Sequence, residues 1–267
     1  MIKVEGISYE VGRRQILQDI SFEVMPGDLV AILGSNGAGK STLLKLLGGE
    51  LKAAPGFINI AHKDILHRQP QELARIRAVL QQHTALTLPF TVSEVVMMGR
   101  YPHFKDDPGP IDRIIVKSAL KKTGIEHLAG RNYLTLSGGE QQRTHLARVF
   151  AQVWFAPRGE TRYLLMDEPV NSLDIRHQHT TLQLAREFAK DGNCVVAVLH
   201  DLNLAMQYAD KVLLLRNGEI TGFGDTRTIL NSDTISHTYD FPLHVVAHDY
   251  DTYPVIVPAF TNHKITT

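Results

Sequence analysis

A glycine-rich turn in the first fifth of the chain has the residue types and spacing of a phosphate-binding loop. It comprises Gly34, Ser35, Asn36, Gly37, Ala38, Gly39, Lys40, Ser41 and Thr42. Glycines let the backbone curl so that its N–H groups point at phosphate oxygens, and the N-terminus of a following helix adds partial positive charge. We expect Lys40 to reach the β- and γ-phosphates of a nucleotide and the Ser41 hydroxyl to ligate Mg²⁺.

Two adjacent carboxylates follow an apolar segment later in the chain. Residues 163–166 read Tyr-Leu-Leu-Met, and Asp167 and Glu168 come directly after them. Asp167 is predicted to hold Mg²⁺, directly or through water, and Glu168 to polarise a water that attacks the γ-phosphate in line. Adjacent acids at a strand end are common in exposed turns, so this prediction depends on the phosphate-binding loop before it.

Hydrophobic patterns predict the elements that must position these residues. Residues 29–33 are continuously apolar, as expected of a strand covered on both faces, and leucines with helical spacing follow the loop until Gly48 and Gly49. Further strands are predicted at 163–166, 195–199 and 212–215, and helices at 175–190 and 202–209. This alternation predicts an α/β fold with a mostly parallel sheet covered by helices.

The domain organisation follows from two changes in this pattern. Residues 2–4, 8–11 and 20–24 read as short strands before the phosphate-binding loop, whereas residues 92–98, 111–123 and 139–154 read as helices. We therefore predict a core made of residues 1–82 and 159–240, with a helical block at 83–158 inserted into it. Residues 241–267 are predicted to form a small C-terminal appendage that carries strands.

Composition excludes several classes of protein. The 267 residues include 28 Lys and Arg against 28 Asp and Glu, so neither a disordered chain nor a general nucleic-acid binder is expected. Cys194 is the single cysteine, which excludes a disulfide framework or a multi-cysteine metal site and favours a reducing compartment. Without a secretory signal pattern or an apolar run of roughly 18 residues, the protein is expected in the cytosol.

A third motif narrows the class of nucleotide-binding protein. Residues 136–143 read Leu-Ser-Gly-Gly-Glu-Gln-Gln-Arg, a second glycine turn that opens a helix. Ser137, Gly138 and Gly139 could bind an anion there through a hydroxyl, backbone N–H groups and the helix dipole. A helix cap alone would explain Ser137 but not the whole string.

This string resembles the signature of the ATP-binding cassette (ABC) family, and with the other two motifs the resemblance covers nearly the whole chain. It implies a P-loop NTPase cassette with a mixed, largely parallel core sheet, an N-terminal antiparallel β region and an inserted α-helical subdomain. It also implies ATP hydrolysis with ATP and Mg²⁺ as cofactors. In the family, the signature of one subunit closes on the nucleotide held by another, so a chain with one copy of each motif is expected to work as a homodimer.

The resemblance assigns roles to further residues. Tyr9 corresponds to an aromatic that stacks on adenine, although a tyrosine in an early strand is more often packing. Gln82 resembles the glutamine that senses Mg²⁺ and the lytic water; Gln81 stands where the family usually has a proline, so either glutamine could fill the role. Residues 171–174, which end at Asp174, resemble the loop that crosses the dimer interface and contributes to the nucleotide site. His200 resembles the switch histidine that hydrogen-bonds the γ-phosphate.

Residues 88–103 are similar to the cassettes of bacterial importers for iron chelates, haem and vitamin B12. Within this group, residues 78–83, 154–162 and 242–246 most resemble the ATPases of haem importers, with ferric siderophore and cobalamin importers as alternatives. The resemblance implies a multi-spanning permease as partner and, indirectly, a periplasmic haem-binding protein, with no nucleic acid. It places the chain at the cytoplasmic face of the bacterial inner membrane, attached through the permease.

Some alternatives stay open on sequence alone. A nucleotide-dependent clamp that acts on a non-membrane partner would carry the same ATP motifs, and so would an exporter subunit. Arg100, Tyr101 and His103 could face a permease or be ordinary surface residues. His177 and His179 point in different directions on a helix, so a solvated face is expected there rather than a metal site.

Overall fold

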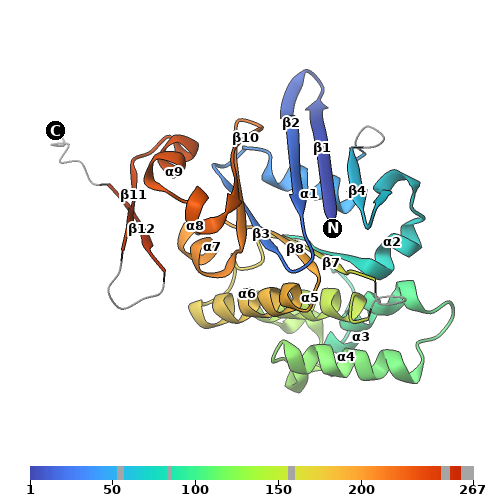
Figure 1. Ribbon diagram of the computed structural model, residues 1–267. Coiled ribbons are helices and arrows are strands. Elements are labelled where there is room, and N and C mark those ends of the chain that lie inside the picture. Colours follow the sequence, from blue (N-terminus) through green and yellow to red (C-terminus); the bar gives the residue numbers. More distant parts are fainter. Residues whose placement is uncertain (53–56, 83–85, 156–159, 248–252, 260–267) are drawn as a thin grey trace.

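A six-stranded sheet lies at the centre of the computed structural model, which describes residues 1–52, 57–82, 86–155, 160–247 and 253–259 (Figure 1). Its strands, in spatial order, are β10 (Glu219–Asp225), β9 (Lys211–Arg216), β3 (Leu29–Gly34), β8 (Cys194–Val198), β7 (Tyr163–Asp167) and β6 (Arg77–Leu80). The five strands from β9 to β6 are parallel, and β10 is antiparallel to β9. The mixed, largely parallel core sheet is therefore confirmed.

A second, antiparallel sheet is formed by the N-terminal part of the chain. It has the order β2 (Arg14–Val24), β1 (Ile2–Val11), β4 (Ile58–Ile60) and β5 (Lys63–Asp64). Where the sequence predicted two short strands, β1 is one continuous strand that keeps its pairing with β2 through several shifts of register. Helix α1 (Lys40–Gly48) packs its leucines into the apolar cluster that the two sheets share.

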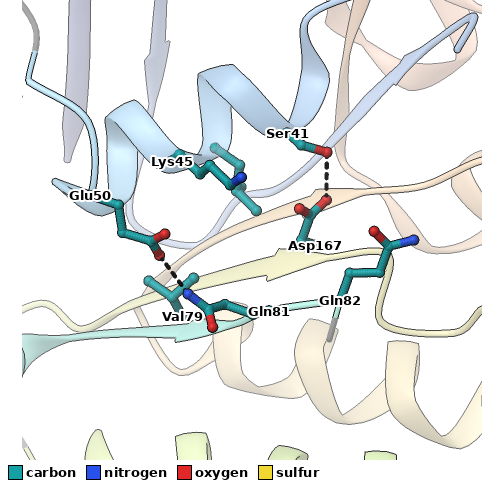
Figure 2. Close-up of a pocket in the computed structure, with 8 residues that line it drawn as sticks. Ser41, Lys45, Glu50, Val79, Gln81, Gln82 and Asp167 are labelled. Carbon is teal, nitrogen blue, oxygen red and sulfur yellow. Dashed lines mark hydrogen bonds between the residues drawn. The ribbon is translucent and has the colours of Figure 1, made fainter. Parts of the chain in front are cut away.

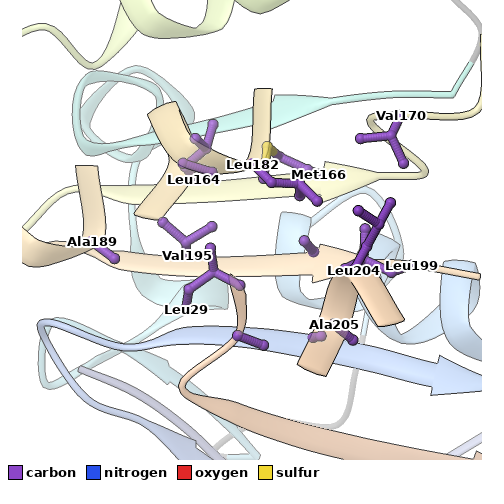
Figure 3. Packing of buried hydrophobic residues seen from close by; sticks show 14 of the residues in the cluster. Leu29, Leu164, Met166, Val170, Leu182, Ala189, Val195, Leu199, Leu204 and Ala205 are labelled. Carbon is purple, nitrogen blue, oxygen red and sulfur yellow. The ribbon is translucent and has the colours of Figure 1, made fainter. Parts of the chain in front are cut away.

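Helices α6 (Ile175–Lys190) and α7 (Leu202–Tyr208) cover the core sheet and form its largest apolar cluster (Figure 3). Every residue of β7 and β8 is buried, in agreement with the continuously apolar sequences of residues 163–166 and of β8. In Figure 3, Leu182 of α6 and Leu204 of α7 lie against Met166 and Leu199 at the ends of these strands. This packing fixes the strand ends that carry Asp167, Glu168 and, directly after Leu199, His200.

The helical block has an apolar cluster of its own. The block contains α3 (Val92–Met97), α4 (Pro110–Lys122) and α5 (Gly138–Gln152), with the 3₁₀ turns η2 (Met98–His103), η3 (Glu126–Leu128) and η4 (Tyr133–Thr135). Helix α5 contributes side chains both to this cluster and to the core cluster, and so joins the two parts. The predicted boundaries at 82/83 and 158/159 involve residues outside the described ranges, so the domain limits remain a proposal.

The remaining elements flank the two sheets. Between β5 and β6 lie the 3₁₀ turn η1 (Ile65–His67) and helix α2 (Pro70–Ile76). After β10 come α8 (Thr226–Ile229), α9 (Ser232–Tyr239) and a separate hairpin of β11 (Leu243–Val246) and β12 (Val255–Pro258). Among the described residues, no helix combines the length and the apolar character that crossing a membrane requires.

Arg100 is a buried structural residue, so both readings that the sequence left open for it are wrong. Only 5% of this residue is exposed, and its guanidinium donates from Nε to Asp112 Oδ1 at 2.9 Å and from Nη1 to the carbonyl of Ala151 at 2.7 Å. His103 Nε2 is also engaged, 2.7 Å from the carbonyl of Gln152. Of the three residues, Tyr101 is the one that remains largely exposed, at 59%.

We expect Arg100→Met to lower the free energy of unfolding by about 3–5 kcal/mol, because the buried Asp112 carboxylate would lose its counter-charge. Urea unfolding followed by circular dichroism measures this change. The matched control is Lys117→Met, which removes a cation that is 78% exposed and 3.9 Å from Glu126; its effect should stay within about 0.5 kcal/mol. Equal stability of the two variants would show that the buried ion pair does not stabilise the helical block.

Candidate active site

The glycine-rich turn connects strand β3 to helix α1, and close contacts require glycine at two of its positions. At Gly34, with φ of +147°, a Cβ atom would lie 2.1 Å from the carbonyl oxygen of Leu215 on β9. At Gly39, with φ of +104°, it would lie 2.7 Å from the side chain of Leu17. Both glycines also adopt positive φ, which other residues adopt only at a cost. The turn can therefore curl tightly against β2 and β9.

The Lys40 ammonium lies inside this turn. It donates to the carbonyls of Gly34 at 2.8 Å and Ser35 at 2.9 Å, and the residue is 6% exposed. Burial lowers the pKa of Lys40, whereas the nearby Glu168 and Asp167 carboxylates act to raise it. An anionic phosphate is a stronger partner for an ammonium than a neutral carbonyl, so Lys40 is placed to bind a phosphate that enters the turn.

A cavity of about 300 Å³ opens beside the turn. It is lined by Asn36, Gly37, Gly39, Lys40, Ser41 and Thr42 of the turn and helix α1, by Glu168 and His200, and by Arg14 and Ile16 of β2. Six of the nine predicted phosphate-binding residues thus share one cavity with Glu168 and His200, whereas Gly34, Ser35 and Ala38 do not line it. Arg14 and Ile16 were not predicted, because one basic and one aliphatic residue at the start of a strand give no distinctive signal.

Tyr9 is not among the residues that line this cavity. It is half-buried on β1, opposite Leu17 of β2, and packs against the cluster that α1 shares with the two sheets. These contacts fit the packing alternative that the sequence left open. Adenine stacking by Tyr9 therefore remains a proposal.

Ser41 and Asp167 meet at the end of the turn. The Ser41 hydroxyl donates to Asp167 Oδ1 at 3.2 Å, and both residues line a second cavity of about 320 Å³ together with Gln82 (Figure 2). Burial raises the pKa of Asp167, and the hydrogen bond from Ser41 acts in the opposite direction. A buried carboxylate beside a hydroxyl oxygen is a donor set that suits Mg²⁺, and a cation there would offset the cost of burying the charge.

Glu168 receives hydrogen bonds from three different segments of the chain. Gln82 Nε2 and Asn171 Nδ2 both donate to Oε2, and His200 Nε2 lies 2.6 Å from Oε1. The Glu168 side chain is only 12% exposed, and its backbone has φ of +49°, a conformation uncommon for residues other than glycine and often found at functional sites. A carboxylate held in this way next to the phosphate-binding turn is suited to accept a proton from a bound water.

The two neighbouring glutamines have different partners. Gln81 Nε2 donates to Glu50 Oε1 at 3.1 Å, whereas Gln82 contacts Glu168. In Figure 2, Gln81 points toward Glu50, and Gln82 lies on the side of Asp167. The geometry therefore favours Gln82 over Gln81 as the glutamine of the active site.

The signature turn lies apart from both cavities in this chain. Ser137 caps helix α5: its hydroxyl accepts from the Glu140 N–H at 3.4 Å, and its own N–H donates to Glu140 Oε2 at 2.7 Å. These bonds from Ser137 lower the pKa of Glu140. Gly138 is exposed, and a Cβ atom added there would meet nothing within 4 Å. Gly139 lies against the loop that contains Leu173 and Ser172.

Asp174 also acts as a helix cap. Its carboxylate accepts from the N–H of His177 at 2.9 Å and contacts His177 Nδ1 at 2.8 Å, which lowers the pKa of Asp174. Neither Asp174 nor the signature residues line the two cavities described above. Within one chain, the structure does not bring them to the phosphate-binding turn.

The other singled-out residues have local partners. His177 is bonded to Asp174, and His179 Nδ1 lies 2.8 Å from the hydroxyl of Tyr208. Within the described ranges, no group of three or more His, Cys, Asp or Glu residues could hold a metal ion. Cys194 is buried on β8, and burial raises the pKa of its thiol to about 11, so it is not an activated nucleophile.

Comparison with known proteins agrees with the geometry. The family described as ABC transporter matches residues 17–171. The chain is 45% identical over 258 residues to the hemin import ATP-binding protein HmuV of Gloeobacter violaceus, covering 97% of this chain and 94% of the relative. It is 44% identical to the HmuV protein of Pseudomonas entomophila, covering 96% and 99%.

Two solved structures are similar in fold. One, described as an inward-facing conformation of an ABC transporter of metal-chelate type, superimposes with a TM-score of 0.81 at 28% identity over 97% of each chain. The other is a dimeric ATP-binding cassette in a post-hydrolysis state bound to ADP and phosphate, with a TM-score of 0.72 at 26% identity, covering 85% of this chain and 99% of that one.

Proposed function

This chain belongs to the ABC transporter family, and from that premise we propose that it is the ATP-hydrolysing subunit of a bacterial importer that carries haem across the inner membrane through a separate permease. The observation that carries the proposal is the convergence of Gln82, Asn171 and His200 on the Glu168 carboxylate, beside the phosphate-binding turn. The haem assignment is supported by relatives 41 to 45% identical over nearly the whole chain, which are hemin import ATP-binding proteins.

In this proposal each residue of the site has a defined task. The backbone N–H groups of residues 35–42 and the Lys40 ammonium hold the triphosphate of ATP. Ser41 and Asp167, with Gln82 beside them, would hold Mg²⁺, which neutralises charge on the phosphate oxygens when bound. Glu168 takes a proton from water as the new oxygen–phosphorus bond forms and the bond to ADP breaks, and His200 orients the Glu168 carboxylate and bonds the γ-phosphate.

A second copy of the chain completes the site in the same proposal. Ser137, Gly138, Gly139 and Asp174 are separate from the cavities of their own chain, which supports a role on the nucleotide held by another copy. A two-fold dimer would then contain two complete sites. ATP favours the closed dimer because it bridges both chains, and hydrolysis removes that bridge.

The proposed location is the cytoplasmic face of the inner membrane, with attachment through the permease and a periplasmic haem-binding protein upstream. The exposed side chains of Leu88 and Tyr101, in the segment similar to importer cassettes, support contact with a protein partner. Equal numbers of basic and acidic residues argue against direct electrostatic docking to anionic lipid. Ferric siderophore or cobalamin as substrate, and a non-transport clamp, are the competing proposals.

The substrate is tested by measuring ATP hydrolysis in the complete assembly of this chain, its permease and its binding protein in lipid nanodiscs. We expect haem-loaded binding protein to raise the ATPase rate several-fold over the empty binding protein, because substrate delivery favours the hydrolytic state. Ferric siderophore and cobalamin, each with the same assembly, are the matched comparisons. Stimulation by one of these and not by haem would overturn the substrate, and stimulation by nucleic acid or ribosomes without the permease would favour the clamp.

A further inference from the structure

The last turn of helix α9 reaches the phosphate-binding turn. The hydroxyl of Tyr239 accepts a hydrogen bond of 3.1 Å from the backbone N–H of Gly34, 205 residues away in sequence. Burial raises the pKa of Tyr239 to about 12, so this hydroxyl stays neutral at physiological pH. The carbonyl of the same glycine accepts from the Lys40 ammonium at 2.8 Å. Tyr239 and Lys40 therefore hold the two backbone polar groups of Gly34.

Arg216 fastens the end of α9 next to this glycine. It is the last residue of β9, directly after Leu215, which is the pairing partner of Gly34. Its guanidinium donates to the carbonyl of His237 at 2.5 Å and forms an ion pair of 3.4 Å with Asp240. A cation at the last carbonyls of a helix is favourable, so this contact fixes the position from which Tyr239 reaches Gly34.

Helix α9 is in turn bonded to the C-terminal hairpin. The Ser236 hydroxyl donates to the carbonyl of Leu243 at 3.1 Å and accepts from its N–H at 2.9 Å. The Ser232 hydroxyl accepts from the N–H of Val245 at 2.9 Å. Two serine side chains of α9 therefore hold strand β11 by hydrogen bonds to its backbone. Strand β12 pairs with β11 over four residues.

Strand β12 of the hairpin is bonded to α7, the helix that follows His200. The side-chain amide of Asn203 in α7 donates to the carbonyl of Ile256 at 3.2 Å and accepts from its N–H at 2.8 Å. Ile256 is 6% exposed and belongs to the core cluster that contains Leu204 and Ala205. A hydrogen-bonded path thus runs from the helix after His200, through β12, β11 and α9, to the first glycine of the phosphate-binding turn.

We propose that α9 and the strands β11 and β12, within residues 232–247 and 253–258, form a brace that positions the ATP site, with Tyr239 as a positioning residue for the phosphate-binding turn and Asn203 as its second attachment. The inference rests on the proposed function, because it takes the turn to be the ATP site. Loss of the Tyr239 hydroxyl would leave the Gly34 N–H without its acceptor, and the turn would no longer be held in one conformation before ATP arrives. The brace therefore acts on ATP affinity and not on the hydrolytic step.

The direct test is Tyr239→Phe, which removes the hydroxyl and keeps the ring. We expect the dissociation constant for MgATP, measured by titration calorimetry, to rise roughly 3- to 10-fold, the effect of one lost hydrogen bond, while kcat at saturating ATP stays within about twofold. The matched control is Tyr133→Phe, which removes a hydroxyl that is bonded to His145 at 2.8 Å in the helical block; its ATP affinity should equal that of the native chain.

A native chain that fails to bind MgATP would contradict the proposed function itself. If the native chain binds MgATP and a folded Tyr239→Phe variant binds it equally tightly, the brace is overturned and the proposed function stands.

A second variant tests the other attachment and does not depend on Tyr239→Phe being folded. Asn203→Ala removes both hydrogen bonds to Ile256, and hydrogen–deuterium exchange reports the protection of the Gly34 amide. We expect faster exchange in a peptide that covers residues 33–39 and unchanged exchange in one that covers α4, which lies in the helical block. Unchanged exchange at residues 33–39 would show that the hairpin does not position the turn.

Discussion

Glu168→Gln is expected to lower kcat for ATP hydrolysis by roughly 10²- to 10³-fold while ATP binding is retained, because general-base catalysis contributes an effect of this size. Glutamine has nearly the same volume and keeps one acceptor oxygen, but it cannot take the proton of the attacking water. The Lys40 ammonium and the backbone of the phosphate-binding turn are unchanged, so affinity for ATP should be preserved. The variant should therefore accumulate with ATP bound and the dimer closed.

The measurement is phosphate release under saturating MgATP, with light scattering to follow the dimer. Glu50→Gln is a matched control, since it makes the same carboxylate-to-amide change in the neighbouring cavity, where Glu50 pairs with Gln81 rather than with Glu168. Its kcat should remain within about twofold of the native value, because the bond that Glu50 accepts comes from Gln81, although Glu50 lines the cavity that contains Ser41 and Asp167. Hydrolysis at the native rate by the Glu168→Gln variant would show that Glu168 is not the general base.

The sequence predicted the central elements of the fold because their signals are local. Strands β3 and β8 are continuously apolar, as is β7 up to Asp167, and all of their residues are buried. Helix α6 was predicted at its observed limits, Ile175–Lys190, since its residues read as a helix. The structure adds that Asp174 caps its start. The short strands β4, β5 and β6 were missed, because two to four residues are too few to show a period.

Contacts between distant residues were not predictable in the same way. Arg100 reads as a surface residue, yet Asp112 and the carbonyl of Ala151 compensate its charge inside the helical block. The role inferred for Tyr239 could not be predicted either, because it depends on a hydrogen bond to Gly34, far away in sequence. The choice between Gln81 and Gln82 likewise needed the position of Glu168 in space.

The proposed dimer places each ATP site between two chains, and two complementary variants test this arrangement. Lys40→Ala removes the ammonium from the phosphate-binding turn, and Gly138→Asp places a carboxylate in the signature turn, where it would repel the phosphates of ATP held by the other copy. Gly138 is exposed with open space at its Cβ position, and an acid in the first turn of a helix is favourable, so the Gly138→Asp chain should fold normally.

Each variant alone should hydrolyse ATP at least 10²-fold more slowly than the native chain, because every site in its dimer is damaged. A mixed dimer, however, contains one intact site, made from the phosphate-binding turn of the Gly138→Asp chain and the signature turn of the Lys40→Ala chain. The decisive measurement is therefore the ATPase rate of the two variants mixed in equal amounts. We expect the rate to recover to about one quarter of the native rate, since half of the dimers are mixed and each has one working site of two. If the mixture is no more active than either variant alone, although light scattering shows that mixed dimers form, the shared ATP site is contradicted.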